Sequence, residues 1–221
     1  MVNVLIIGAS GGIGAALYRH HKDNGYDVVG LSRSVDGLNI VDAQSVSEHL
    51  GHLDSTFDRV IVATGALSVN GANPEKTIKA VNAQAMADQF AVNAIGPALI
   101  LAHASRLLPR DRASVFAVLS AKVGSIGDNR LGGWISYRAA KAALNQIVHT
   151  SAIELSRSHP KSSVVALHPG TVQTPFMSKY AARHDSVPAD QAGTNLGRVM
   201  DDLTPDQTGG FYDYTGSRLP W

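Results

Sequence analysis

The sequence predicts a doubly wound α/β fold, in which a parallel sheet of about seven strands carries helices on both faces. Short apolar runs rich in β-branched residues alternate with longer segments of helical period along most of the chain. These runs are continuously apolar, which is typical of strands that are buried on both faces. A length of 221 residues without a linker, a low-complexity tract or a repeat indicates a single domain, 1–221.

The expected elements follow in order along the chain. Strands are expected at Val2–Ile7, Asp27–Leu31, Arg59–Ala63, Ser114–Leu119 and Ser163–Leu167, with a weaker one at Gly210–Asp213. Helices are expected near Ile13–Asn24, Ala43–Leu50, Pro74–Leu107, Tyr137–Ser158 and Asp190–Leu203. Inside the third helix, Pro97 has no N–H to donate, so we expect a kink that frees the carbonyl of Asn93. Residues 171–190 show no decisive pattern and are expected to form a substrate loop.

Composition argues against several classes of function. The chain has 19 basic and 18 acidic residues without a block of like charge, so no nucleic-acid partner is expected. It has no cysteine, and its nine histidines lack ligand spacing, so no metal site is expected. Met1 leads directly into an apolar strand, and the longest uncharged stretch, residues 89–105, is too polar to span a bilayer. We therefore expect a cytoplasmic protein without a membrane partner.

A glycine-rich loop joins the first expected strand to the first helix. Glycines at positions 8, 12 and 14 allow a tight turn and let backbone N–H groups approach a pyrophosphate at the positive end of the helix. The place of the loop between strand and helix favours dinucleotide binding over the alternative, a plain tight turn. The cofactor contacts expected here are Gly8, Ser10, Gly12, Ile13 and Gly14.

The end of the second expected strand bears on the choice of cofactor. Rossmann-type proteins that prefer NAD usually place an acidic residue there, whereas this chain has Ser32, Arg33 and Ser34. An arginine offers a planar fork of donors to a 2′-phosphate, and the serine hydroxyls add further donors. The sequence therefore favours NADP(H) over NAD(H). The alternative is a solvated loop arginine.

Tyr137 and Lys141 lie four residues apart at the start of a strongly helical stretch, and so share one helix face. A neighbouring ammonium favours the phenolate and lowers the pKa of a tyrosine, which makes such a pair a proton donor and acceptor near neutral pH. The alternative is an ordinary surface pair. The order of the motifs, with the glycine loop first and this pair after the strand Ser114–Leu119, favours the catalytic interpretation.

Together these motifs resemble the short-chain dehydrogenase/reductase family over nearly the whole chain. The motifs are Gly8-x-x-x-Gly12-x-Gly14, Asp42, Ala63-Thr64-Gly65 where the family usually has Asn-Ala-Gly, Asn93, Tyr137-x-x-x-Lys141 and Pro169-Gly170-x-Val172-x-Thr174. The stretch 124–138 is further similar to sniffer-like carbonyl reductases and bacterial C-factor proteins. The resemblance implies NADPH-dependent reduction of a small-molecule carbonyl substrate by a homo-oligomer, a dimer or a tetramer, and the apolar ending Leu219-Pro220-Trp221 adds weak support for the oligomer.

The resemblance also implies roles for individual residues. Tyr137 is the expected catalytic acid/base, and Lys141 binds the nicotinamide ribose while it lowers the pKa of the tyrosine. Asp42 meets the adenine, and the main-chain carbonyl of Asn93 holds a water that joins the lysine to solvent. The remaining cofactor contacts expected from the family are Ala63, Thr64, Gly65, Pro169, Gly170, Val172 and Thr174.

One segment departs from the family. The usual Ser-Ser-x-x-Gly is replaced by Ser120-Ala121-Lys122-Val123-Gly124, so the second serine, which orients the substrate carbonyl, is missing. Either Ser120, at the end of its strand, or Ser125, from the following loop, is expected to replace it, and we favour Ser120. Trp134, Phe176, Met177 and Tyr180 are candidates for an apolar substrate pocket or for core packing. The missing serine keeps a rival function open: a nucleotide-bound signalling or interaction protein with little turnover.

Overall fold

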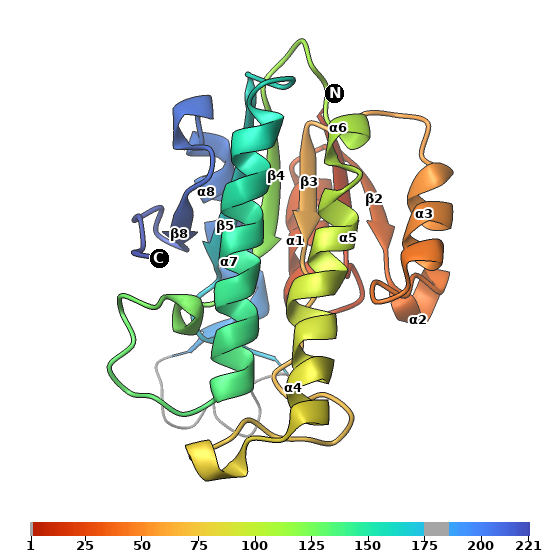
Figure 1. The fold of residues 1–221 in the computed structure, drawn as a ribbon. Helices are drawn as coiled ribbons and strands as arrows, with labels where there is room; N and C mark the ends of the chain where they lie inside the picture. Colours follow the sequence, from red (N-terminus) through yellow and green to blue (C-terminus); the bar gives the residue numbers. More distant parts are fainter. Residues whose placement is uncertain (1, 175–185) are drawn as a thin grey trace.

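The computed structural model describes residues 2–174 and 186–221, which form a central parallel sheet between two layers of helices (Figure 1). The six strands of this sheet lie in the order β2-β1-β3-β4-β5-β8, and all neighbouring strands are parallel. The strands are β1 Asn3–Ile7, β2 Asp27–Leu31, β3 Arg59–Val62, β4 Ser114–Leu119, β5 Ser162–His168 and β8 Phe211–Asp213. The doubly wound α/β fold is confirmed, and each predicted strand is present with ends shifted by at most one residue.

Continuous apolar strands bury both faces of the sheet. In β1, Val4 and Ile6 pack in the core under one helix layer, and Leu5 and Ile7 pack in the core under the other. Helices α1 (Gly12–Asp23) and α8 (Ala189–Asp202) cover the first face. Helices α3 (Ala43–Gly51), α5 (Gly96–Leu101) and α7 (Ile135–Leu155) cover the second (Figure 1).

The prediction of one long helix over Pro74–Leu107 is wrong. Residues 74–82 contain only a 3-10 turn, Ile78–Ala80, and the helical part is divided into α4 (Ala83–Phe90), a π-helical turn (Ala91–Ile95), α5 and α6 (Ala104–Leu107). The Asn82 side chain starts α4 by accepting a hydrogen bond from the Ala85 N–H at 3.0 Å. Pro97 lies in the first turn of α5, where its missing N–H is tolerated. A π-helical turn therefore takes the place of the simple kink that we expected.

Two smaller features were not predicted. A single helical turn, α2 (Arg33–Asp36), follows β2, and β6 (Val172–Gln173) pairs with β7 (Val187–Pro188) in a separate small sheet. Most of the expected substrate loop, with Phe176, Met177 and Tyr180, lies outside the described residues. No helix in the described part of the chain is both long and apolar enough to cross a membrane.

The apolar ending of the chain packs against its own domain. Leu219 and Trp221 lie against the core on the α7 face, and the Trp221 ring stacks on Phe211 with the ring centroids 5.6 Å apart. The support for an oligomer that we drew from Leu219-Pro220-Trp221 is therefore withdrawn, because these side chains already have an intramolecular partner. Homo-oligomerisation stays a prediction from the family resemblance.

Candidate active site

A cleft of about 990 Å³ opens along the carboxyl ends of the parallel strands, where ligands bind in open α/β sheets. Loops that follow β1, β3, β4 and β5 line it, together with the first turns of α7. The expected site residues that line the cleft are Ser10, Gly12, Ile13, Ala63, Thr64, Gly65, Ser120, Tyr137, Lys141, Pro169, Gly170, Val172 and Thr174. The expected residues that lie outside its lining are Gly8, Gly14, Ser32, Arg33, Asp42 and Asn93.

The glycine loop presents the uncapped N-terminus of α1 to the cleft. Gly11 precedes the helix without a side-chain cap, and the first turn carries no acidic residue, so its backbone N–H groups are available to an anion. A Cβ at Gly12 would lie 2.5 Å from the Cγ2 of Thr174, and one at Gly14 would lie 2.1 Å from the carbonyl oxygen of Gly8. These close approaches exclude side chains, and the loop fits the pyrophosphate of a dinucleotide.

Gly8 does not line the cleft but sets the turn that shapes the loop. Its φ of +91° lies in the region that glycine adopts freely, and its N–H donates to the Leu31 carbonyl at 2.7 Å. The Gly8 carbonyl in turn accepts from the Gly11 N–H at 3.0 Å. Gly8 and Gly14 therefore shape the path of the loop backbone and do not themselves line the cleft.

The residues that follow β2 lie beside the glycine loop. The Ser34 hydroxyl donates to the Ser10 hydroxyl at 2.8 Å, which ties the two loops together. The buried Ser32 caps α2, because its hydroxyl accepts from the Val35 N–H at 3.3 Å. Arg33 is exposed, and its guanidinium has no ion-pair partner among the described residues. The exposed position of Arg33 suits a cation that binds a phosphate. The Ser32 hydroxyl, in contrast, already makes a hydrogen bond within the protein.

Asp42 is the N-cap of α3. Its Oδ1 accepts hydrogen bonds from the N–H groups of Gln44 at 2.9 Å and Ser45 at 3.4 Å. Both of these bonds use one carboxylate oxygen, and the side chain is exposed. The capping role fixes the Asp42 carboxylate at the start of the helix.

Tyr137 and Lys141 are buried on one face of α7, one turn apart, and both line the cleft. The Lys141 ammonium donates to the carbonyl oxygen of Leu119, at the end of β4, at 3.0 Å. Burial raises the pKa of the Tyr137 phenol and lowers the pKa of the Lys141 ammonium to about 7. Our expectation that the ammonium lowers the pKa of Tyr137 is therefore not met, because desolvation raises it.

Ser120 and Ser125 have different surroundings. Ser120 lines the cleft, and its hydroxyl donates to the Oδ1 of Asn145 at 2.6 Å. The Nδ2 of Asn145 is buried without a hydrogen-bond partner in the described structure. The Ser125 hydroxyl donates to the Trp221 carbonyl at 3.3 Å and accepts from the Asp128 N–H at 3.1 Å. Ser125 thus stabilises its own loop, and of the two serines only Ser120 belongs to the lining of the cleft.

Asn93 lies in the π-helical turn, and its side chain holds the loop after β3. It donates to the Ala66 carbonyl at 2.8 Å and to the Oε1 of Gln89 at 2.7 Å, and it accepts from the Ala66 N–H at 3.0 Å. A Cβ at Gly65 would lie 3.1 Å from the Oδ1 of Asn93 and 3.4 Å from the Nζ of Lys141. Asn93 and Lys141 therefore flank Gly65, although Asn93 does not itself line the cleft.

Two buried polar atoms at the carboxyl edge of the sheet have no partner in the described structure: the Oγ1 of Thr64, in the loop after β3, and the Nδ1 of His168, the last residue of β5. Both residues line the cleft. Burial lowers the pKa of His168 to about 4, so its imidazole is neutral near pH 7. Buried polar groups normally have partners, and unpaired ones at a cleft suit a bound polar ligand.

Three residues of the site were missed by the sequence reasoning. Asn145 follows Lys141 by four residues, and the same spacing, extended by one turn, would have placed it on the helix face that carries Tyr137 and Lys141. Glu75 accepts hydrogen bonds from both the hydroxyl and the N–H of Ser136, next to Tyr137, and so caps the first turn of α7. Gln89 precedes Asn93 by four residues and fixes its amide. No sequence signal marked Glu75, which lies 61 residues from its partner.

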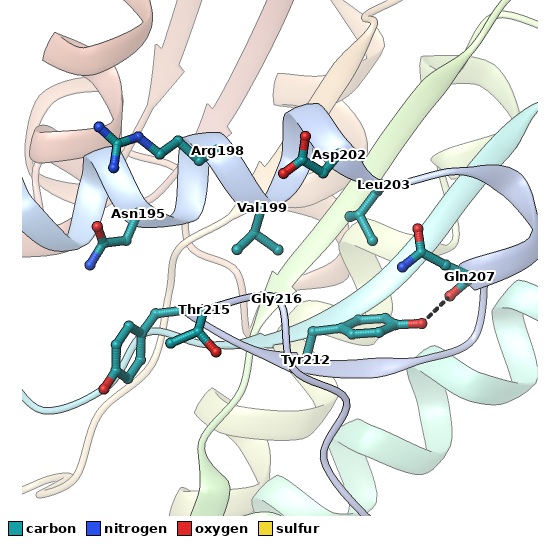
Figure 2. A pocket seen from close by; sticks show the side chains of 10 residues that line it. Asn195, Arg198, Val199, Asp202, Leu203, Gln207, Tyr212, Thr215 and Gly216 are labelled. Carbon is teal, nitrogen blue, oxygen red and sulfur yellow. Dashed lines mark hydrogen bonds between the residues drawn. The ribbon is translucent and has the colours of Figure 1, made fainter.

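A second, smaller cavity of about 390 Å³ lies between α8 and the segment after β8 (Figure 2). Its lining includes Arg198, Asp202 and Tyr212, and the Tyr212 hydroxyl donates to the Gln207 carbonyl at 3.1 Å. None of the residues singled out from the sequence lines this cavity. The larger cleft is therefore the candidate active site.

The chain matches the family model for short chain dehydrogenase over residues 2–185. It is 29% identical over 236 residues to 1-hydroxy-2-glutathionyl-2-methyl-3-butene dehydrogenase of Rhodococcus sp. strain AD45, with 100% of both chains covered. It is 37% identical over 140 residues to C-signal of Myxococcus xanthus, which covers 62% of this chain and 78% of that protein.

The fold is similar to that of an NADPH-bound carbonyl reductase from chicken fatty liver. The TM-score is 0.80 with 22% identity, over 99% of this chain and 94% of the other. At this identity the likeness establishes the fold alone. The family match, in contrast, extends over most of the sequence, and the protein is a member of the short-chain dehydrogenase/reductase family of oxidoreductases.

Proposed function

We propose that the protein reduces an aldehyde or ketone to an alcohol with NADPH as the reductant. The observation that carries this proposal is the buried Tyr137–Lys141 pair, which lines the same cleft as the uncapped N-terminus of α1. A proton donor and a dinucleotide loop on one cleft are the two parts that carbonyl reduction needs.

Tyr137 is the proposed proton donor to the carbonyl oxygen. Burial raises the pKa of its phenol, which keeps the proton in place at neutral pH until a carbonyl oxygen develops negative charge beside it. Ser120 is the proposed second donor to that oxygen, held at the strand end by its hydrogen bond with Asn145. Bound NADPH supplies the hydride that the carbonyl carbon receives.

The remaining residues hold and orient the cofactor. The N–H groups at the start of α1 bind its pyrophosphate, Arg33 binds the 2′-phosphate, and Asp42 lies toward the adenine. Lys141 binds the nicotinamide ribose from the position where it already donates to the Leu119 carbonyl. The exposed Arg33 and the absence of an acidic residue at the end of β2 support NADPH over NADH.

The test is consumption of NADPH, followed by absorbance, across a panel of aldehydes, ketones and quinones. We expect turnover on at least one class of carbonyl compound, and a lower rate with NADH. The relative from Rhodococcus is named as a dehydrogenase of a glutathionyl alcohol, so the same panel is run in the reverse direction with alcohols and NADP⁺. Tight NADPH binding without turnover in either direction would instead favour a nucleotide-bound signalling protein, in keeping with the likeness to C-signal.

A further inference from the structure

The cleft is strongly basic, although the chain as a whole is nearly neutral. The sequence has 19 basic and 18 acidic residues. Along the cleft, however, Asp128 is the one acidic residue in the described lining, against five basic residues: Lys76, Lys122, Arg130, Arg138 and Lys141. Lys141 belongs to the catalytic pair, so four cations stand outside the proposed catalytic groups. Composition alone does not account for this asymmetry.

Three of these four cations form no close ion pair with a carboxylate of the described residues. Lys122 pairs with Asp128 at 3.4 Å. Within the described residues, Lys76, Arg130 and Arg138 form no ion pair. Asp128 acts on Arg138 through a Coulomb attraction without a close ion pair, and it also pairs with Lys122. One carboxylate therefore faces several cations, and the excess positive charge on the wall of the cleft attracts an anionic ligand.

The chain segments that carry Lys76, Arg130 and Arg138 lie close together beside Tyr137. Glu75, next to Lys76 in the chain, accepts from the Trp134 N–H through its carbonyl at 2.6 Å and from the Ser136 N–H through its carboxylate at 3.2 Å. A Cβ at Gly133 would lie 3.9 Å from the Lys76 carbonyl oxygen. The segment that carries Lys76 is thus held against the 130–136 segment, immediately before the catalytic tyrosine.

Arg138 is held in place by hydrogen bonds to the backbone. Its Nε donates to the Gly133 carbonyl at 3.0 Å, and one terminal nitrogen donates to the Val123 carbonyl at 3.3 Å. The side chain is partly buried, and the second terminal nitrogen has no hydrogen-bond partner among the described residues. A guanidinium fixed on two backbone carbonyls is a preorganised donor for an oxyanion, because little further side-chain freedom is lost on binding.

We propose that the cleft selects carbonyl substrates that carry an oxyanion, a carboxylate or a phosphate, and that Arg138, with Lys76 and Arg130, binds this group. The proposal rests on the carbonyl-reductase function proposed above and names its substrate class. The Trp134 ring, whose centroid lies 6.3 Å from that of Tyr137, supplies an apolar wall for the rest of the substrate. The substrate therefore has an anionic group at one end and its carbonyl at Tyr137.

A matched pair of aldehydes tests the proposal. We compare kcat/KM for 4-carboxybenzaldehyde with that for its neutral ester, methyl 4-formylbenzoate, and add 4-formylphenyl phosphate to distinguish a carboxylate from a phosphate. All rates are measured at saturating NADPH, so that effects of charge on cofactor binding do not enter. The wild-type protein is expected to prefer an anionic aldehyde by about 10-fold or more, and high salt is expected to reduce that preference.

Two variants remove the cations. Arg138→Gln is expected to lower kcat/KM for the anionic aldehyde by about 10- to 100-fold and to leave the ester within about threefold. The double variant Lys76→Gln/Arg130→Gln changes only exposed side chains and is expected to lower kcat/KM for the anionic aldehyde by about 3- to 10-fold. This double variant still tests the proposal if Arg138→Gln also disturbs the loops to which Arg138 donates hydrogen bonds. Arg157→Gln, which removes an exposed cation beyond the far end of α7, is the matched control and is expected to change neither rate.

Binding of terephthalate separates this proposal from the proposed function. Terephthalate has no aldehyde or ketone group to reduce, and calorimetry in the presence of NADP⁺ is expected to show binding that Arg138→Gln weakens. If neither aldehyde is reduced but terephthalate binds in this way, the proposed function fails and the anion site stands. Equal kcat/KM in the wild type for the ester and for both anionic aldehydes, or terephthalate binding that is unchanged by all these variants, would overturn the anion site.

Discussion

The Lys141 ammonium lies 6.0 Å from the centroid of the Tyr137 ring, and both side chains are almost fully buried at the carboxyl edge of the sheet. Desolvation acts on the two groups in opposite directions, because it disfavours the charged form of each. It raises the pKa of the tyrosine and lowers that of the lysine to about 7. At neutral pH the pair therefore holds a protonated phenol beside an amine that is near its own midpoint.

Replacing Tyr137 by phenylalanine removes the proposed proton donor and keeps the ring. Because general acid catalysis is typically worth about 10²- to 10⁴-fold, kcat is expected to fall by that factor while the Kd for NADPH stays unchanged. Steady-state rates and fluorescence titration of NADPH measure the two quantities. Tyr18→Phe, which removes a phenol hydroxyl from α1 outside the cleft lining, is the control. A Tyr137→Phe rate within about threefold of the wild type would remove Tyr137 from the mechanism.

Lys141 makes the stability of the cofactor-free protein depend on pH. Its pKa is about 7 in the folded protein against 10.5 for the ordinary group, so between these values the unfolded chain binds the extra proton. The free energy of unfolding of the wild type, relative to Lys141→Met, is therefore expected to rise from about pH 7 toward pH 10, by at most about 1.4 kcal/mol per pH unit. Below pH 7 the difference is expected to be flat. Urea titrations at several pH values measure it, and parallel curves for the two proteins would show that Lys141 has an ordinary pKa.

Arg33 is the expected discriminator between the two nicotinamide cofactors. A hydrogen bond to a charged group is worth about 1.5–3 kcal/mol, so Arg33→Ala is expected to weaken NADPH binding by about 10- to 100-fold. NADH lacks the 2′-phosphate, and its affinity is expected to stay nearly the same. Equal weakening of both cofactors, or a wild-type preference for NADH, would contradict the assignment.

The two serines give a prediction with an internal control. Ser120→Ala removes the hydroxyl that donates to Asn145 and lines the cleft, and we expect kcat to fall with little change in NADPH affinity. Ser125→Ala removes hydrogen bonds with Trp221 and Asp128, and we expect a lower melting temperature with kcat nearly unchanged. Should Ser125→Ala slow turnover while Ser120→Ala does not, the assignment would be reversed.

The sequence predicted the sheet well because each strand carries its own local signal. Runs such as Val4 to Ile7 are apolar on both faces, and glycine and proline mark the turns at their ends. The Tyr137–Lys141 pair was found for the same reason, since one turn of helix brings both residues together. The apolar runs and the four-residue spacing are both properties of short segments, so they can be recognised from the sequence without knowledge of the fold.

The long segment from Pro74 to Leu107 was misread because its structure depends on contacts distant in sequence. Glu75 is fixed by Ser136, and the Asn93 side chain is held by Ala66. The loop that contains Glu75 and the π-helical turn that contains Asn93 are therefore both stabilised by residues distant in the sequence. The rise in the pKa of Tyr137 was missed for a related reason. Burial is a property of the whole fold, whereas the spacing of Tyr137 and Lys141 shows only that they are close.

Asn93 lies in the π-helical turn, and we predict that the shape of this turn controls the supply of protons to Lys141. The family resemblance implies that the main-chain carbonyl of Asn93 binds a water that connects Lys141 to solvent. In the structure the Asn93 side chain is fixed by Ala66 and Gln89, and Asn93 and Lys141 flank Gly65. A π-helical turn is a common device for changing the backbone at a functional site. The relay therefore requires that this turn keep its shape.

Asn93→Leu leaves the N–H and carbonyl of Ala66 without partners, at about 1–3 kcal/mol for each group that stays buried, and so loosens the turn. We expect a lower kcat and a larger solvent deuterium isotope effect on kcat, because the proton path is broken. The Kd for NADPH is expected to change much less than kcat, because the glycine loop at the start of α1 is untouched, although Asn93 also holds the loop that carries Ala63 to Gly65. Ser162→Ala removes a buried hydrogen bond to Ser114 far along the sheet and is the control for lost stability alone, with no change in the isotope effect expected. If Asn93→Leu lowers the melting temperature as Ser162→Ala does and leaves kcat and the isotope effect alone, Asn93 has a structural role and Lys141 reaches solvent by another path.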